Sequence, residues 1–139
     1  MDKRTLGKTG LEVFPIALGG FPFCAANHTQ DWDPYTPDGK KEVYKTINAA
    51  LDGGINYIDT APAYGKGYSE TLIGEVLKHR RSECYIATKV PRSGGKRDVV
   101  ESVESSLRRL NCDYIDVAQI HGREFSANDF NRIMSGLLS

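Results

Sequence analysis

The chain has 139 residues, of which 40% are hydrophobic and 26% are charged. Because this length and composition are ordinary for a globular protein, we expect one domain with its own hydrophobic core. Lysine plus arginine and aspartate plus glutamate number 18 each, so the charge balance gives no reason to expect a nucleic-acid or anionic-membrane partner.

The terminus and the cysteines indicate the compartment. Residues 1–10 lack the apolar segment of a secretory signal, and no run approaches the roughly 20 apolar residues of a membrane span. Cys24, Cys84 and Cys112 form neither a CxxC pair nor a metal-ligand spacing with histidine, so we expect reduced thiols and no metal site. These features favour a soluble, cytoplasmic protein.

The N-terminal part predicts a hairpin, a strand and a long loop. Two short arms within RTLGKTGLEVF (residues 4–14) predict a small β-hairpin. The apolar run FPIALGG (residues 14–20) is typical of a buried strand. Residues 21–39 contain several prolines and are predicted to form a loop, and ordered loops of such length are often functional.

The remainder of the chain alternates apolar runs typical of strands with amphipathic segments typical of helices. Strands are predicted at residues 55–61 (INYIDTA), 84–90 (CYIATKV) and 114–122 (YIDVAQIHG), and helices at residues 40–52, 69–77, 98–110 and 128–138. Ser69 is the candidate N-cap of the second helix.

The order of elements is a hairpin followed by four β-loop-α units of roughly 30 residues each. Strands that alternate with helices indicate a parallel sheet with right-handed crossovers. Two architectures compete, an open doubly wound sheet and the first half of a (β/α)8 barrel. No GxGxxG motif follows the first strand, so the open dinucleotide-binding sheet loses its main support. We therefore predict an α/β fold, the N-terminal half of a (β/α)8 TIM barrel preceded by a β-hairpin.

Three predicted strands end on an ionisable residue, namely Asp59, Lys89 and His121. They are 89 − 59 = 30 and 121 − 89 = 32 residues apart, so each belongs to the next βα unit and all three should share one rim of the sheet. Ligands bind at this rim in both candidate architectures. Tyr64 lies on the loop after the second strand and can fold back over the rim. Each residue alone has a structural explanation, as a turn cap, a solvent-directed lysine, a structural histidine or a covering tyrosine, but their shared rim favours an active site.

The motif DTAPAYG (residues 59–65) resembles a signature of the aldo-keto reductases. It matches their pattern DTAxxYG in full, and Glu70 stands at the family's acidic position downstream. Further similar segments are RTLGKTGLEV at the hairpin, IATKV at the lysine strand and LRRLNCDYIDVAQIH before the histidine. The resemblance runs from Arg4 to about Ser135, and it is nearest to the aldose and L-galactose dehydrogenase branch, partly through HGREF (residues 121–125).

The resemblance implies hydride transfer between a nicotinamide cofactor, NADP or NAD, and the carbonyl or alcohol of an aldehyde, ketone or aldose. A carbonyl that accepts hydride becomes an alkoxide and needs a proton, yet a phenol ionises only near pH 10. Tyr64 would donate the proton, the Lys89 ammonium would stabilise the phenolate that remains, and Asp59 would hold Lys89. His121 would position the substrate oxygen by a hydrogen bond. Asp59 and Thr60 would face the nicotinamide end of the cofactor.

The family fold has eight βα units, whereas this sequence supplies four. The later strands, which carry most cofactor contacts in the family, have no counterpart in residues 1–139. We therefore expect a partial NADP-dependent oxidoreductase domain, apparently truncated, with an apolar inner face and two exposed sheet edges that favour self-association.

The missing cofactor-binding half argues against activity of this chain in isolation, and three alternatives to an active enzyme stay open. The chain could be a catalytically silent remnant that binds a partner through an exposed edge, or a half-barrel that dimerises to rebuild the site. It could also be an open α/β module that binds an anionic ligand at the strand ends. Four aromatic residues of the long loop either line a substrate pocket or pack the loop onto the barrel, namely Phe21, Phe23, Trp32 and Tyr35.

Overall fold

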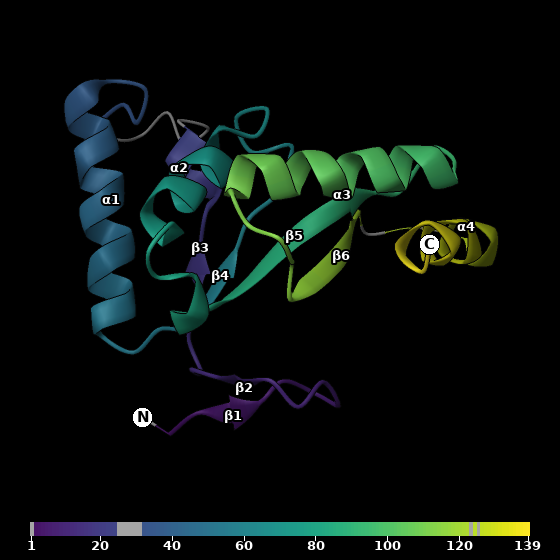
Figure 1. The fold of residues 1–139 in the computed structure, drawn as a ribbon, viewed down its shortest axis with the longest axis horizontal. Helices are drawn as coiled ribbons and strands as arrows, with labels where there is room; N and C mark the ends of the chain where they lie inside the picture. The colour runs from purple at the N-terminus through teal and green to yellow at the C-terminus, as the bar shows by residue number, and fades with distance from the viewer. Residues whose placement is uncertain (1, 25–31, 123, 125) are drawn as a thin grey trace.

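The structure is a computed structural model that describes residues 2–24, 32–122, 124 and 126–139. The first element is an antiparallel hairpin of β1 (Arg4–Thr5) and β2 (Glu12–Val13), at the lower end of the molecule in Figure 1. Arg4 pairs with Val13 and Thr5 with Glu12, which confirms the predicted hairpin.

Four further strands form one parallel sheet in the order β3-β4-β5-β6. They are β3 (Leu18–Gly19), β4 (Tyr57–Asp59), β5 (Tyr85–Pro91) and β6 (Val117–His121). Neighbours in the sheet are also neighbours in the chain, so the strand order does not reverse. An open doubly wound sheet reverses its order at a switch point, whereas a barrel does not. The predicted fold class, α/β with the first half of a (β/α)8 barrel, is confirmed.

Helices separate the parallel strands along the chain (Figure 1). The α-helices are α1 (Pro37–Asp52), α2 (Tyr68–Leu77), α3 (Lys96–Leu110) and α4 (Ala127–Leu137), and the short 3-10 helices are η1 (Phe21–Cys24) and η2 (Arg81–Glu83). Each of α1, α2 and α3 connects two adjacent strands of the sheet, and α4 follows β6.

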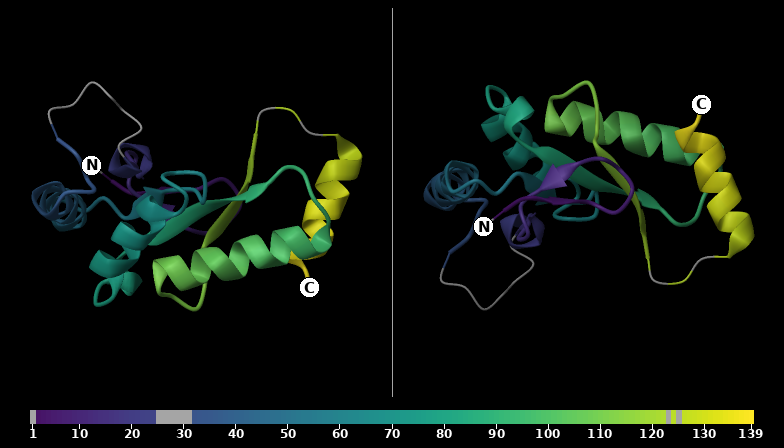
Figure 2. Two further views of the ribbon diagram at one scale, coloured as in Figure 1. Left: turned by 90° about the horizontal axis from the view of Figure 1, so that it is seen from above. Right: turned by 90° about the horizontal axis from the view of Figure 1, so that it is seen from below.

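The helices cover one face of the sheet and form the core with it. In both views of Figure 2, α2 and α3 run along the same side of β5. Ile58 and Ile86 of the sheet pack with Leu72 and Leu77 of α2 in the larger buried cluster, and Val90 joins a smaller cluster with α3 and α4. Complete burial of such aliphatic side chains contributes about 1.5–3 kcal/mol each, so this face anchors the sheet.

The opposite, inner face of the sheet carries both polar and apolar side chains. Successive strand residues point to opposite faces, so the residues that alternate with Ile58, Ile86 and Val90 face away from the helices. The polar and ionisable ones include Tyr57, Asp59, Lys89, Gln119 and His121, and the apolar ones include Ala87, Pro91 and Val117. The inner face, which we expected to be apolar, is therefore mixed.

All four helices begin one to three residues before their predicted positions, and in two of them a side-chain cap explains the earlier start. The Thr36 hydroxyl accepts a hydrogen bond of 3.1 Å from the amide of Gly39, and Pro37 occupies the first turn, so α1 starts three residues before Lys40. The Ser126 hydroxyl likewise caps α4 by accepting from the amide of Asp129 at 3.1 Å.

The predicted N-cap of the second helix is wrong. Ser69 is the second residue of α2 and is fully buried, while Gly67, with φ of 91°, occupies the cap position. The Ser69 hydroxyl is used for tertiary contacts instead, because it donates to the carbonyl oxygen of Gly20 at 2.8 Å.

Parts of two predicted segments lie outside the described residues. The loop predicted at residues 21–39 is described only at 21–24, which form η1, and at 32–39, whose last three residues belong to α1; residues 25–31 are outside. Arg123 and Phe125 of the HGREF segment are also outside. Within the described part of the chain, none of the helices has both the length and the apolar character required to cross a membrane.

Candidate active site

Lys89 is held at the carboxyl end of β5 by two acceptors on the neighbouring strand. Its Nζ donates to Oδ1 of Asp59 at 2.7 Å and to the backbone carbonyl oxygen of Thr60 at 2.8 Å. The register pairs Asp59 with Ala87, so Lys89 lies one pleat beyond and reaches back over the end of β4. The Lys89 side chain is 13% exposed, and the ammonium is therefore fixed in position at a mostly shielded ion pair.

Tyr64 is followed by an unusual turn. The next three residues all have left-handed backbone, with φ of 62° at Gly65, 54° at Lys66 and 91° at Gly67. This conformation costs a non-glycine residue such as Lys66 roughly 1–2 kcal/mol, so the surrounding packing must maintain the turn. The Nζ of Lys89 lies 4.8 Å from the centre of the Tyr64 ring, in contact with its face.

His121 completes the cluster from the end of β6. It pairs with Pro91 in the sheet, and its ring centre lies 6.1 Å from that of Tyr64 with the two planes at 90°. A cavity of about 170 Å³ opens between Lys89, His121 and the loop residues Pro62 and Ala63. Ligand pockets usually measure about 300–1,000 Å³, so the described residues supply one wall of a site.

The two residues predicted to face a cofactor have different surroundings. The Asp59 side chain is 30% exposed and uses Oδ1 for Lys89, which leaves its second oxygen accessible. Thr60 is 0% exposed, and its hydroxyl lies 3.0 Å from the hydroxyl of Ser69 on the helix side of the sheet. Only the Thr60 backbone carbonyl, through its bond to Lys89, takes part in the rim.

The aromatic residues of the first loop divide into two groups. Phe23 is buried in the core and Trp32 packs against it, while Tyr35 stacks on Tyr68 with ring centres 4.3 Å apart. Phe21 is 48% exposed and meets the Tyr64 ring edge to face at 5.1 Å. Of the four aromatic residues, Phe21 is therefore the one in contact with the tyrosine of the rim.

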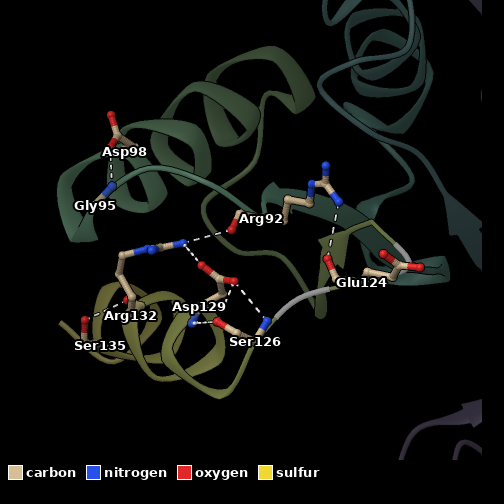
Figure 3. Close-up of polar contacts among 8 residues, drawn as sticks. All are labelled: Arg92, Gly95, Asp98, Glu124, Ser126, Asp129, Arg132 and Ser135. Carbon is tan, nitrogen blue, oxygen red and sulfur yellow. Dashed lines mark hydrogen bonds and ion pairs between the residues drawn. The ribbon is translucent and has the colours of Figure 1, made fainter.

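The loops after β5 and β6 are joined above the rim by arginine contacts, drawn in Figure 3. Arg132 of α4 donates through Nη2 to the carbonyl oxygen of Arg92 at 2.9 Å and to Oδ1 of Asp129 at 2.6 Å. The Arg92 side chain donates to the carbonyl oxygen of Glu124 at 3.3 Å. Hydrogen bonds from the Ser126 amide and hydroxyl, together with Arg132, lower the pKa of Asp129 to about 2.

Sequence reasoning named Glu70 only as a match to the family pattern and did not predict the buried polar contacts directly behind the rim. Glu70 is 0% exposed and accepts from Thr88 at 2.6 Å and from Arg109 at 2.6 Å. The available signal was an acidic residue next to the apolar stripe of α2, since a buried carboxylate requires partners. Its partners lie 18 and 39 residues away and could not be inferred from helical spacing.

A family model described as the Aldo/keto reductase family matches residues 18–137, and the chain belongs to this family. Among curated relatives, the aldo-keto reductase YhdN of Bacillus subtilis is 38% identical over 132 residues, covering 87% of this chain and 38% of the relative. L-galactose dehydrogenase of Arabidopsis thaliana is 33% identical over 137 residues, covering 93% of this chain and 40% of the relative. The chain thus spans about two fifths of the length of these relatives.

Solved structures of the family superpose on most of this chain. An aldo-keto reductase from Bacillus halodurans in its holo form has a TM-score of 0.77 at 31% identity, covering 98% of this chain and 45% of that one. An aldo/keto reductase from Klebsiella pneumoniae in complex with NADP and acetate has a TM-score of 0.68 at 28% identity, covering 83% of this chain and 38% of that one. The fold is therefore that of the first half of the barrel in these proteins.

Proposed function

We propose that this chain carries the proton-transfer part of an oxidoreductase site that interconverts a carbonyl and an alcohol with NADP or NAD. The observation that carries the proposal is the Lys89 ammonium, fixed between Asp59 and the Thr60 carbonyl oxygen and lying 4.8 Å from the Tyr64 ring. A fixed cation beside a phenol, at the rim where parallel strands bind ligands, suits acid-base chemistry.

The described residues fit one end of a nicotinamide cofactor. The Asp59 side chain is 30% exposed at the rim, Lys89 and His121 line the cavity of about 170 Å³, and the Tyr64 ring contacts both of these residues. That volume is too small for a dinucleotide, so the remainder of the cofactor would be held by groups beyond those described. When bound, the cofactor supplies the hydride to the carbonyl carbon or accepts it from the alcohol.

The residues of the chain would handle the proton. During reduction, the Tyr64 hydroxyl gives its proton to the oxygen of the former carbonyl, and the product is the alcohol. The Lys89 ammonium stabilises the negative charge left on the phenolate, while Asp59 keeps Lys89 in place. His121 donates a hydrogen bond that orients the substrate oxygen. In oxidation the phenolate takes the proton back from the alcohol.

The substrate we propose is a small aldehyde, ketone or aldose. The support is the similarity to L-galactose dehydrogenase and the polar residues beside the rim, where Gln119 pairs with Lys89 in the sheet register. Exposed Phe21 offers an apolar surface for a carbon chain or sugar ring next to Tyr64. The three free cysteines lead us to propose a cytoplasmic location, and the balanced charge leads us to propose no nucleic-acid or anionic-membrane partner.

The test is a titration of the 139-residue chain with NADPH and NADH, followed by turnover of an aldehyde and aldose panel. If the described residues suffice for activity, the chain should bind nucleotide and show turnover that Tyr64→Phe and Lys89→Met both strongly reduce. Lys45→Met, which removes an exposed lysine of α1, is the matched control and should retain turnover. A folded chain that neither binds nucleotide nor turns over any carbonyl would contradict the proposal for this chain.

A second candidate function is self-association or partner binding through the sheet edges. Within the described residues, β3 and β6 each have a strand neighbour on one side only. A cavity of about 430 Å³ adjoins β3 and α1, one of about 400 Å³ adjoins β6 and α3, and Leu138 at the end of α4 is 80% exposed. Light scattering tests this candidate, because a monomer at high concentration would contradict self-association.

A further inference from the structure

Two consecutive residues of α2 contact the backs of the two strands that carry the ion pair. Ser69 meets Thr60, the residue after Asp59, and Glu70 meets Thr88, the residue before Lys89. Both threonines are on the helix side of the sheet, whereas Asp59 and Lys89 are on the other. One turn of α2 therefore binds β4 and β5 behind the point where Lys89 and Asp59 meet in front.

The contact of Ser69 has a defined direction. Ser69 has one hydroxyl proton, which it donates to the carbonyl oxygen of Gly20 at 2.8 Å, so Thr60 is the donor across their 3.0 Å separation. The amide of Gly20 in turn donates to the carbonyl oxygen of Asp59 at 2.7 Å. Ser69 thus connects α2 to the ends of both β3 and β4.

The contact of Glu70 is charged and fully buried. Oε1 accepts from the Thr88 hydroxyl and Oε2 accepts from Nε of Arg109, each at 2.6 Å. A buried carboxylate deprived of its cation carries a large desolvation penalty, so Glu70 strongly constrains where Arg109 and Thr88 can lie. The Thr88 hydroxyl is therefore held in place, and the adjoining backbone of Lys89 is held with it.

Arg109 also contacts the turn that presents Tyr64. Its side-chain stem lies against Gly67, where an added Cβ would come within 2.3 Å of the Arg109 Cδ. Gly67 is the last of the three left-handed residues after Tyr64. The guanidinium binds Glu70 while the stem abuts this turn, so a single side chain of α3 touches the supports of both Tyr64 and Lys89.

We propose that Glu70 and Arg109 are positioning residues that hold the Tyr64 turn and the Lys89 strand at a fixed separation from behind the sheet. The inference rests on the proposed function only in assigning proton transfer to Tyr64 and Lys89. Neither Glu70 nor Arg109 touches the rim cavity, so they act through the residues they hold. Loss of either should move the Lys89 ammonium relative to the Tyr64 ring even where the protein stays folded.

The separation can be measured without cofactor or substrate. In the 139-residue chain, the Tyr64 ring current should shift the NMR signal of the Lys89 ε-methylene upfield, and Tyr64→Leu defines the unshifted value. We expect Glu70→Gln and Thr88→Val each to reduce the upfield shift to about half or less and to weaken the cross-relaxation between these side chains. Thr88→Ser keeps the hydroxyl and should preserve both signals.

A matched control separates positioning from general stability. Ile133→Val removes one buried methylene from the cluster between α3 and α4, far from Glu70, and should lower the melting temperature while leaving the Lys89 shift unchanged. If Thr88→Val fails to fold, Arg109→Lys replaces it in the test. Arg109→Lys keeps the charge and most of the stem, and it should also reduce the upfield shift of Lys89. An unchanged Lys89 shift in folded Glu70→Gln and Arg109→Lys overturns the proposal. A change of the Lys89 shift in Ile133→Val as large as that in Glu70→Gln also overturns it. Neither result depends on whether the chain binds NADPH.

Discussion

The two sides of the rim are built differently. On the β4–β5 side, Lys89 and Asp59 are supported from behind by buried contacts of α2, among them the fully buried carboxylate of Glu70. On the β6–α4 side, Arg92 and Arg132 join two loops through contacts near solvent, as Figure 3 shows. Exposed polar contacts contribute little to stability and change easily, whereas buried networks fix geometry. The groups proposed to move the proton are thus held rigidly, and the loops beside His121 can vary.

The largest effect expected is on turnover. Removing a general acid or the cation beside it typically lowers the rate by about 10²–10⁴-fold, so Tyr64→Phe and Lys89→Met should reduce kcat by that factor. Absorbance of NADPH at saturating aldehyde measures it. A loss of less than about tenfold in both variants would place proton transfer elsewhere on the rim.

The next largest effect is on the core that supports the rigid side. Ile58 of β4 is fully buried in the core cluster that includes α2, so Ile58→Ala should lower the free energy of unfolding by about 2–5 kcal/mol. Phe130 of α4 is 44% exposed, and Phe130→Ala should change the free energy of unfolding by about 0.5 kcal/mol or less. Urea denaturation of both variants checks the contrast. Equal losses would show that α4 belongs to the same cooperative core.

A smaller effect is expected at the cap of α4. Ser126→Ala removes the hydroxyl that accepts from the Asp129 amide, and loss of such a cap costs about 1 kcal/mol. Amide exchange in the first turn of α4 should accelerate, while exchange in α2 should not. Uniform acceleration in both helices would mean that the loops beside His121 are not locally adjustable.

The same cap makes the stability of α4 depend on pH in a direction that can be predicted. The folded pKa of Asp129, about 2, lies below the value near 3.9 of an unfolded aspartate, so the carboxylate stabilises the folded state above pH 3.9 or so. This contribution is lost as the pH falls from about 4 through 2. Protection factors of the α4 amides between pH 5 and 2, which correct for the pH dependence of intrinsic exchange, measure the loss, and Asp129→Asn should make this protection independent of pH. A pH response of α4 that persists in that variant would require another group.

The smallest effect concerns a buried thiol on the rigid side. Burial raises the pKa of Cys84 to about 11, so little thiolate exists near pH 8 and alkylation by iodoacetamide should be slow in the native chain. Labelling should become fast in urea, where burial is lost. Rapid native labelling at Cys84 would indicate that the end of β5 opens readily.

Residue spacing predicted most of the fold and the shared rim. Parallel strands bring their carboxyl ends to one edge, so a recurrence of about 30 residues was enough to place Asp59, Lys89 and His121 together. Helix starts were less accurate, since Thr36 lies upstream of the amphipathic pattern it caps. Ser69 looked like a cap because its residue type suits that position equally well.

The residues that could not be predicted are those whose partners lie far away in the sequence. The contact of Arg109 with Glu70 depends on how α3 packs beside α2, which periodicity does not encode. The resemblance implied that Lys89 lies beside Tyr64, but spacing predicted neither the contact with the ring face nor the left-handed turn at residues 65–67. The roles proposed for the rim residues remain predictions until variants are assayed.

The mixed character of the inner face of the sheet affects the heat capacity of binding there. Covering apolar surface lowers the heat capacity strongly, whereas covering polar surface raises it. Any molecule that docks over Tyr57, Gln119 and Lys89 buries both kinds of surface, so its binding should show a small heat-capacity change for the area covered. The association would then be driven near room temperature by hydrogen bonds and charge more than by release of water from hydrocarbon.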